Sequence, residues 1–269
     1  MISLSTIFRE LELRDIRRQS IISSDISKKN KKFNKYVNIL TYDHALPLIQ
    51  NNGYLNASVI EFKNFNSKDD SNQIKWIATQ SPMISNLYNF YLTIIDYKVQ
   101  NVIQLTITNV DQYLPSPHQT LKLNDLSIKF ESLVDVNEDY DLKLFTITKS
   151  NEIIPHRFYH YYYKQWPDHS TPNSNSSIIN LINKVSQSNC NLVHCSAGIG
   201  RTGSFIILQE LLRLKASNIP INNNFYDDLT QQYTNNDNQN LLFNCIDYIR
   251  RSRPLSIEYY QFKWLNQFT

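Results

Sequence analysis

Residues 194–203 read His-Cys-Ser-Ala-Gly-Ile-Gly-Arg-Thr-Gly, and they are the most informative part of the 269-residue chain. The whole chain holds 4 glycines, although an average usage of about 7% would give roughly nineteen. Three of them, Gly198, Gly200 and Gly203, fall within this stretch. Glycine allows backbone conformations that are closed to other residues and lets a ligand approach the main chain closely. The stretch is therefore predicted to be a tight functional loop.

The flanking residues place this loop between a strand and a helix. Residues 191–194 resemble a short buried strand, and residues 202–215 form an apolar helical pattern. Small residues after Cys195 allow consecutive backbone N–H groups to turn inward, and the helix adds its positive N-terminal end. This arrangement predicts a cradle for a tetrahedral anion, which Arg201 closes with a bidentate grip on two oxygens. Cys195 is predicted to lie at its base, where positive surroundings favour the nucleophilic thiolate.

Two other interpretations of the same residues are weaker. The spacing of Gly198, Gly200 and Gly203 also matches a dinucleotide-binding fingerprint. That match occurs late in the chain, and no Asp or Glu is placed to hold a ribose. An inert core thiol is the other interpretation of Cys195, but it suits Cys190 and Cys245 better. The anion cradle is preferred because it uses every residue of the loop.

Composition and charge exclude several classes of protein. The 27 Lys and Arg residues against 24 Asp and Glu give a net charge of +3, too little to argue for nucleic-acid binding. Three cysteines without C-x-x-C spacing predict neither a disulfide framework nor a metal site, and they favour a reducing compartment. Arg9 and Glu10 interrupt any signal-peptide core, and no apolar run reaches 18 residues. Secretion and membrane insertion are therefore not expected.

Hydrophobic periodicity predicts an α/β fold for the rest of the chain. Helices are predicted within residues 1–35, 84–97, 178–187, 202–215, 241–250 and 257–268. Strands are predicted at residues 54–60, 75–79, 101–106 and 191–194, with antiparallel strands in 121–163. The Asn-rich residues 222–240 are predicted to form an inserted loop. No internal repeat or shift in composition marks a second domain, so residues 1–269 are predicted to form one domain.

The Cys-x5-Arg loop resembles the signature of the cysteine-based protein tyrosine phosphatases. Trp166-Pro167-Asp168 stands upstream in the order that the family uses, and the similarity extends over nearly the whole chain. The resemblance implies a twisted mixed β-sheet flanked by helices, and hydrolysis of phosphotyrosine through a cysteinyl-phosphate intermediate without metal or cofactor. It implies Asp168 as the general acid and later the base. The phosphate-binding residues would be Ser196, Ala197, Gly198, Ile199, Gly200 and Arg201.

Residues 34–39 resemble the phosphotyrosine-recognition loop of the family. Tyr36 is implied to stack on the substrate ring, and Asn38 stands where an Asp usually grips the peptide backbone. A phosphoserine side chain is too short to reach the thiolate in such a deep pocket, and dual-specificity relatives lack this loop. Phosphoinositide-specific relatives place lysines inside the phosphate loop, where this chain has none. The expected partners are therefore phosphotyrosine-containing proteins.

Several positions depart from the family pattern. After Asp168 the usual Gly-Val-Pro reads Ser-Thr-Pro, and the loop after Leu105 lacks the usual bracing Glu and Lys. In the water-positioning loop, Gln261 takes the place of the second glutamine and Glu258 that of the first. Thr202 is implied to hydrogen-bond the thiolate. These departures keep open the alternative of a binding module that holds phosphotyrosine proteins with little turnover.

The chain's size and its bias toward Asn, Ile and Lys are similar to the phosphatases that polydnaviruses (bracoviruses) of parasitoid wasps deliver into host insect cells. An AT-rich coding sequence alone also produces such a composition. The resemblance implies a virulence factor that disrupts host signalling. We expect a monomer in the cytoplasm, which is the host cell cytoplasm if the protein is viral.

Overall fold

The structure is a computed structural model that describes residues 3–62, 74–107, 112–150, 152–216, 224–227, 232–235 and 241–269. The strands of the main sheet are β1 (Ala57–Glu61), β2 (Lys75–Thr79), β3 (Asn101–Gln104), β4 (Thr120–Leu123), β5 (Leu126–Val136), β6 (Tyr140–Lys149), β7 (His156–Tyr163) and β8 (Cys190–His194). The helices are α1 (Leu4–Ile21), α2 (Asp25–Lys29), α3 (Leu87–Asp96), α4 (Asn175–Val185), α5 (Gly200–Ala216), α6 (Leu241–Arg250) and α7 (Tyr259–Leu265).

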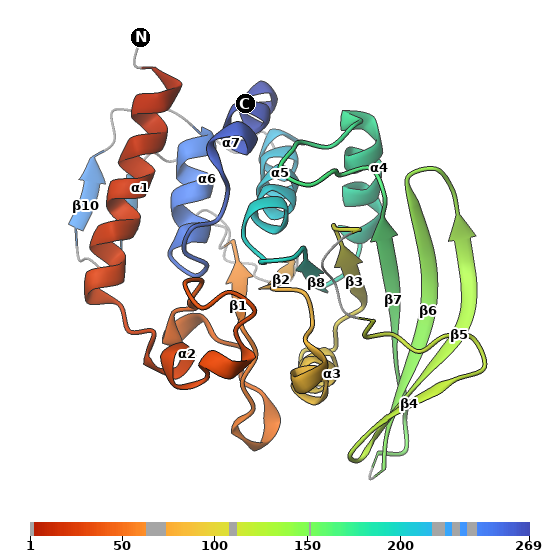
Figure 1. Cartoon of the computed structure of the whole chain (residues 1–269). Coiled ribbons are helices and arrows are strands. Elements are labelled where there is room, and N and C mark those ends of the chain that lie inside the picture. Colours follow the sequence, from red (N-terminus) through yellow and green to blue (C-terminus); the bar gives the residue numbers. More distant parts are fainter. Residues whose placement is uncertain are drawn as a thin grey trace.

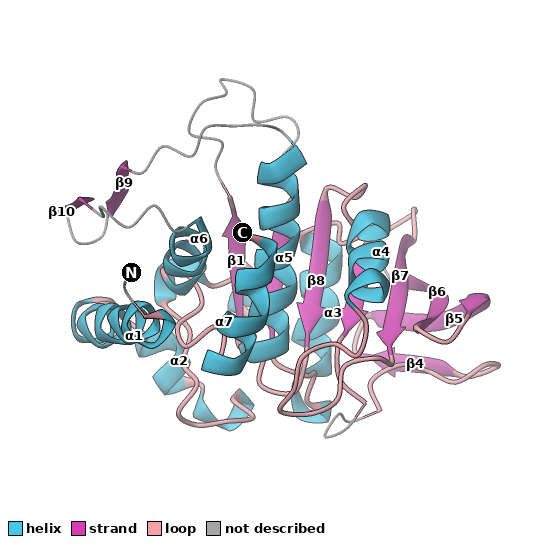
Figure 2. Ribbon diagram, turned by 90° about the horizontal axis from the view of Figure 1, so that it is seen from above, coloured by secondary structure: helices cyan, strands magenta, loops and turns pink. Residues whose placement is uncertain are grey.

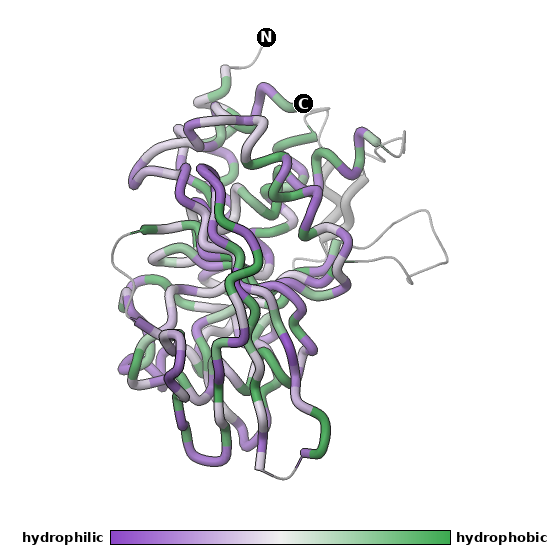
Figure 3. The backbone as a smooth tube through the Cα atoms, turned by 90° about the vertical axis from the view of Figure 1, so that its right-hand side faces the viewer, coloured by the Kyte–Doolittle hydropathy of each residue, from purple (hydrophilic) through white to green (hydrophobic). Residues whose placement is uncertain are grey.

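Within the described residues, one mixed eight-stranded sheet has the order β1-β2-β8-β3-β7-β6-β5-β4 (Figure 1). The pairs β2–β8, β8–β3 and β3–β7 are parallel, and the remaining pairs are antiparallel. The predicted antiparallel strands within residues 121–163 are β4 to β7. Hydrophobic and hydrophilic residues alternate along these extended strands (Figure 3), as expected where one face is more buried than the other.

Helices cover both faces of the sheet. Helix α3 lies on one face, and α4, α5, α6 and α7 lie on the other (Figure 1). Alternate residues of a strand point to opposite faces, so Leu192 of β8 packs in the cluster with α3, whereas Val193 packs in the cluster with α5. Strand β8 is buried at every position. The loop that follows β8 therefore begins from a fully buried strand.

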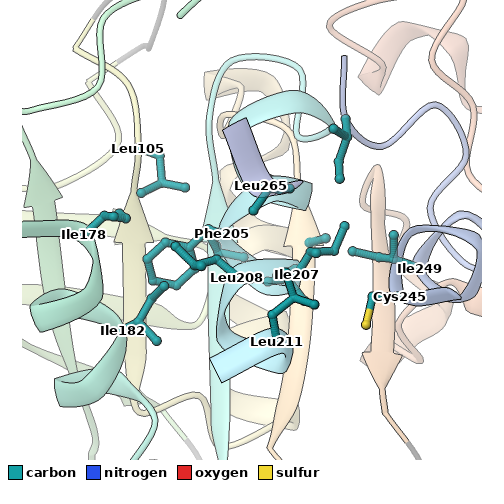
Figure 4. Packing of buried hydrophobic residues seen from close by; sticks show 14 of the residues in the cluster. Leu105, Ile178, Ile182, Phe205, Ile207, Leu208, Leu211, Cys245, Ile249 and Leu265 are labelled. Atoms are coloured by element: carbon teal, nitrogen blue, oxygen red, sulfur yellow. The ribbon is translucent and has the colours of Figure 1, made fainter. Parts of the chain in front are cut away.

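Helix α5 directly follows the glycine-rich loop and packs between α4 and α6. Its side chain Phe205 lies toward Ile178 and Ile182 of α4, and Leu211 lies on the side of Cys245 of α6 (Figure 4). Twelve consecutive residues at its start and middle are buried, which explains why the pattern there has so few charges. Burying a side chain as large as Phe205 or Leu211 stabilises a fold by roughly 1.5–3 kcal/mol. Helix α5 therefore anchors the glycine-rich loop firmly.

Several predicted elements differ from the structure, including the helices expected at 84–97 and 257–268, which are the shorter α3 and α7. The Asn-rich segment contains a short antiparallel pair, β9 (Asn224–Asp227) and β10 (Gln232–Asn235), so the prediction of a loop through residues 222–240 was wrong there. Helix α4 begins before residue 178 because the Ser174 hydroxyl caps it by accepting from the Ser177 N–H at 3.2 Å. Helix α5 begins at Gly200, two residues before the predicted start.

No helix in the described part of the chain is both long and apolar enough to cross a bilayer.

Candidate active site

The candidate site lies at the carboxyl edge of the parallel strands. Because these ends meet at one edge of a sheet, the segments that follow β2, β3, β7 and β8 come together there (Figure 2). The Ser81 N–H donates to the Ser196 carbonyl at 2.9 Å, and the Leu105 N–H donates to the His194 carbonyl at 2.9 Å. Segments from three strands are thus fastened to one another around residues 195–200, called the phosphate loop below.

Gly198 forms the sharp turn of the phosphate loop. Its φ is +72°, which side-chain-bearing residues disfavour. A Cβ at this position would lie 2.2 Å from the Thr79 carbonyl oxygen, which belongs to β2 and cannot move aside. The Gly198 N–H donates to Cys195 Sγ at 3.3 Å. Gly198 is therefore required, because the positive φ and the close approach to Thr79 leave no room for a Cβ. In this conformation its N–H reaches the Cys195 sulfur.

Arg253 holds the outer side of the phosphate loop. Its guanidinium donates to the carbonyl oxygens of Gly198 at 2.9 Å and Ala197 at 3.1 Å, and to Asn56 Oδ1 at 2.7 Å. In a trans peptide the C=O and the following N–H point in opposite directions. Because both carbonyls face Arg253, the next two N–H groups face the inside of the loop. Burial lowers the pKa of Arg253 to about 10, and the guanidinium still keeps its charge at neutral pH.

Arg201 and Asp168 meet above the loop. Arg201 Nη2 donates to Asp168 Oδ1 in a close contact, and Nη1 donates to the carbonyls of Leu105 and Trp166, both at 3.3 Å. The Arg201 side chain is 8% exposed, whereas that of Asp168 is 44% exposed. The buried guanidinium is therefore fixed in place, and a bound anion can replace the more exposed carboxylate on Arg201.

The segment that carries Asp168 is anchored by Trp166. This side chain is buried against Trp264 of α7, with ring centroids 5.6 Å apart, and its Nε1 donates to the Ser170 carbonyl at 2.9 Å. The Ser170 hydroxyl in turn donates to the Pro167 carbonyl at 2.8 Å. The Ser that replaces the usual Gly of the family therefore closes the turn with its own side chain.

His194 orients the start of the phosphate loop. Its Nδ1 lies 3.2 Å from the Cys195 carbonyl, and its Nε2 lies 2.8 Å from the Tyr113 hydroxyl. Since a carbonyl only accepts, we assign the proton to Nδ1, so that Tyr113 donates to Nε2. The same hydroxyl lies 2.7 Å from His160 Nε2, which then donates to it. Burial lowers the pKa of His194 to about 4 and that of His160 well below its usual value, so both stay neutral.

Tyr36 stands at the rim of the loop, where the sequence placed it. Its hydroxyl lies 2.8 Å from Ser196 Oγ, and its side chain is 36% exposed. Gln80 holds this segment in place, because its Oε1 accepts from the Lys35 N–H at 2.9 Å and its Nε2 donates to the Phe33 carbonyl at 2.9 Å. Asn38 is exposed two residues further on. Tyr36 is therefore held beside the phosphate loop and stays partly exposed.

Thr202 is buried in the first turn of α5, and among the described residues its hydroxyl has no hydrogen-bond partner. The bond to the thiolate that the resemblance implied is therefore not formed in this structure. A buried hydroxyl without a partner is uncommon. The role of Thr202 in thiolate departure remains a prediction.

Gln261 lies against the last residue of the phosphate loop. A Cβ on Gly200 would be 3.1 Å from Gln261 Oε1 and 3.2 Å from Nε2. Gln261 is also the third residue of α7, where its Oε1 accepts from the Glu258 N–H at 3.1 Å and the Glu258 carboxylate accepts from its backbone N–H. This reciprocal cap orients the amide against Gly200, with Oε1 engaged by the Glu258 N–H.

Several residues of the site were missed by sequence reasoning. Arg253, Tyr113 and His160 were not singled out, because their contacts join segments far apart in the chain. Residues 108–111 of the predicted bracing loop lie outside the described residues.

In the part of the chain that the structure describes, no group of three His, Cys, Asp or Glu residues could hold a metal ion.

A model of the protein-tyrosine phosphatase family matches residues 30–268, and the chain belongs to this family. The chain is 28% identical over 210 residues to tyrosine-protein phosphatase non-receptor type 2 of Mus musculus, covering 72% of this chain and 50% of that protein. It is 31% identical over 213 residues to non-receptor type 20 of the same species, with coverages of 74% and 48%. The chain thus spans about half the length of these curated relatives.

Solved structures share the fold. The catalytic domain of human protein tyrosine phosphatase non-receptor type 18 matches with a TM-score of 0.79 at 21% identity, covering 98% of this chain and 94% of that one. The Trypanosoma cruzi protein tyrosine phosphatase TcPTP1 matches with a TM-score of 0.78 at 24% identity, covering 99% and 91%. The predicted twisted mixed sheet flanked by helices is confirmed, as is the resemblance to the family.

Proposed function

We propose that the chain hydrolyses phosphotyrosine in proteins through a cysteinyl-phosphate intermediate. In the first step Cys195 Sγ attacks phosphorus, an S–P bond forms, and the P–O bond to tyrosine breaks. Asp168 gives its proton to the departing tyrosine oxygen. In the second step water attacks phosphorus, Asp168 takes a proton from it, and the S–P bond breaks to release phosphate. The proposal is carried by the convergence of Cys195, Arg201 and Asp168 on one loop.

Positive charge and fixed N–H groups supply most of the expected rate. Phosphoryl transfer depends mainly on alignment and on stabilising charge at the equatorial oxygens. The inward N–H groups of the phosphate loop and the guanidinium of Arg201 are the donors for these oxygens. In the structure Asp168 contacts this guanidinium. We expect a bound phosphoryl group to replace that contact and to leave Asp168 facing the tyrosine oxygen.

Tyr36 supports phosphotyrosine-containing proteins as the substrates. Its ring borders the phosphate loop through Ser196, so a substrate ring can stack on it while its phosphate reaches Cys195. Non-receptor type 18, a protein of the same fold, has been solved with HER2 phosphopeptides. Asn38 in place of the usual Asp is expected to alter the affinity for the peptide backbone.

One observation favours the second candidate, a domain that binds phosphotyrosine with little turnover. Gln261 and Glu258 cap α7 reciprocally, and this cap engages the Gln261 amide oxygen that would otherwise accept from the attacking water. If hydrolysis of the cysteinyl-phosphate is slow, the chain stays phosphorylated on Cys195 and turns over little substrate. Efficient turnover is still the preferred proposal, because Cys195, Arg201 and Asp168 are all present in one site.

The remaining predictions concern the setting of this activity. We propose that residues 1–269 act as one catalytic domain and as a monomer in the cytoplasm. The compositional resemblance to polydnavirus phosphatases favours the cytoplasm of a host insect cell and the disruption of host signalling there. Expression in insect haemocytes tests this setting, with a loss of cellular phosphotyrosine and altered cell behaviour as the expected result, and a Cys195→Ser chain as the control.

The direct test of the function measures phosphate release from a tyrosine-phosphorylated peptide. The wild-type chain is expected to release phosphate over many turnovers, and Cys195→Ser to release none while still binding the peptide. Cys190→Ser is the matched control, because that thiol lies at the opposite end of β8. Its replacement should leave phosphate release unchanged. A single burst of dephosphorylated peptide, with the phosphate retained on Cys195 and no further release, would favour the binding domain. Equal release by the wild type and Cys195→Ser would refute both candidates.

A further inference from the structure

The connection between α6 and α7 is held in a strained conformation. Leu255 and Ile257 have φ values of +61° and +74°, in a region that residues with a Cβ disfavour, branched ones above all. Such residues persist only where the surroundings fix them. Ser256 between them is fully buried and Ile257 is nearly so. Specific contacts must therefore fix this turn.

Arg250, the last residue of α6, holds the turn from below. Its Nε donates to the Ser256 carbonyl at 2.9 Å, and its Nη2 donates to the Ile257 carbonyl at 3.1 Å. The side chain is 3% exposed. A planar guanidinium suits this geometry because its N–H groups diverge in a fixed fork toward two acceptors.

Asp15, which lies on α1, completes the arrangement. Its Oδ2 lies 3.2 Å from Arg250 Nη1 and also accepts from the Leu255 N–H at 3.2 Å. The Asp15 side chain is almost fully buried, as is that of Arg250. One carboxylate oxygen therefore binds both the guanidinium that holds Ile257 and the backbone N–H of Leu255. The Asp15–Arg250 pair thus fixes both strained residues, and Arg18 lies 3.8 Å from the other oxygen of Asp15.

This turn is packed directly against the phosphate loop and its helix. A Cβ on Gly203 would lie 3.0 Å from Ser256 Cβ, and Gln261 lies against Gly200. The turn therefore sets the position of Glu258 and Gln261, the two side chains that stand in the water-positioning region. A shift at Leu255 or Ile257 would move these side chains relative to Cys195 without touching Cys195 itself.

We propose that Asp15 is a positioning residue for hydrolysis of the phosphocysteine, acting through Arg250 and the turn at Leu255–Ile257. This inference rests on the proposed function, because it concerns the second step of that reaction. Helix α1 lies before the residues that the family model matches, which begin at residue 30. The chain thus uses its N-terminal helix to fix a loop of the active site.

The test compares the wild type with Asp15→Asn on 4-nitrophenyl phosphate, by stopped-flow and steady-state kinetics. The ratio kcat/KM reports the steps up to phosphorylation of Cys195, whereas kcat includes hydrolysis. Asp15→Asn is expected to lower kcat by about tenfold or more, the scale of loss that small misplacements cause. KM should fall by the same factor, and kcat/KM and the rate of the initial burst should stay within about twofold of the wild type.

Asp247→Asn is the matched control. Asp247 is a buried carboxylate that pairs with Arg18 of α1 at 2.6 Å and with Arg251 at 3.2 Å, but it does not contact the turn. It should lower stability without lowering kcat relative to kcat/KM. Should Asp15→Asn fail to fold, Arg250→Lys serves instead. It keeps the charge beside Asp15 but cannot donate to both carbonyls, and the same split between kcat and kcat/KM is expected.

Hydrogen exchange gives a readout that does not depend on activity. The backbone amides of residues 255–261 should exchange faster in Asp15→Asn than in the wild type or in Asp247→Asn. Unchanged exchange there would overturn the inference, as would equal losses of kcat and kcat/KM. A wild-type chain that turns over no substrate would instead refute the proposed function, and the exchange data would still decide whether Asp15 holds the turn.

Discussion

The three cysteines of the chain lie in different chemical surroundings. Burial raises the pKa of Cys190 to about 12 and that of Cys245 well above its usual value, so both remain thiols at neutral pH. Cys195 is the one that accepts an N–H from the turn of the phosphate loop, next to Arg201. A reactive cysteine requires donors and positive charge around the sulfur. The surroundings of each cysteine therefore decide which sulfur can be a reactive thiolate.

Asp168 can be tested by varying the leaving group. Asp168→Asn should lower kcat/KM for a phosphotyrosine peptide by about 10²–10⁴, because protonation of the tyrosine oxygen is lost. The loss should be much smaller for 4-nitrophenyl phosphate, whose leaving group needs no proton. Steady-state kinetics on both substrates measure the ratio, with the exposed Glu131→Gln as the control. Equal losses on both substrates would argue against the acid role.

The buried histidines should make the fold sensitive to acid. Their pKa values, about 4 for His194 and lower than usual for His160, lie below the value of an unfolded histidine near 6.5. The unfolded state therefore binds more protons as the pH falls below 6.5. For His194 this difference should remove about 2 kcal/mol of stability between pH 7 and pH 5, and the loss continues down to the folded pKa. The lowered pKa of His160 should add a loss in the same direction.

Urea denaturation of the wild type and His160→Gln at both pH values measures this effect. The amide cannot take up a proton, so the variant should lose less stability on acidification than the wild type. An identical pH dependence in the two chains would show that His160 is not kept neutral by the fold.

At the scale of elements, Arg253 turns a flexible glycine-rich segment into a fixed ring of donors. Arg253→Lys should lower kcat/KM by about 10², because one ammonium group cannot donate to Gly198, Ala197 and Asn56 at once. Arg251→Lys, on the same segment, is the control and should behave like the wild type. Kinetics together with inhibition by vanadate measure the effect. Full activity of Arg253→Lys would mean that the loop holds its shape without the guanidinium.

Local patterns explain why the elements at the site were predictable. The strand, the glycine-rich loop and the helix that surround Cys195 are contiguous, so the motif alone fixed their order. The start of α4 was missed because Ser174 belongs to a polar run that resembles a loop until its cap is seen. The pair β9–β10 was missed because Asn-rich sequence has low strand propensity. Pairing between strands overrode that propensity.

At the scale of the whole molecule, the contacts that sequence could not reveal are those between distant segments. Arg253 and Gly198 are 55 residues apart, and Asp15 and Leu255 are 240 residues apart. Such pairs have no periodicity or spacing that a single sequence could display. The hydrogen bonds that join Tyr113 to His160 and His194 are of the same kind. The motif predicted the residues that react with the substrate. Contacts between distant segments supply the residues that orient them.

Anion binding at the site should stabilise the whole fold. A ligand that binds only the native state at 100 times its Kd adds about 2.7 kcal/mol, so inorganic phosphate should raise the midpoint of thermal unfolding. Arg201→Met removes the guanidinium that closes the cradle and should abolish most of this shift. An equal shift in the variant would place the phosphate elsewhere on the protein.

The covalent intermediate tests the central claim most directly. The wild-type chain is mixed with a phosphotyrosine peptide, quenched in acid during turnover, digested and mapped by mass spectrometry. The proposed mechanism requires one phosphoryl group, carried on Cys195 and absent from Cys195→Ser. Phosphate release without any phosphoryl group on Cys195, or with the group on another residue, would contradict it.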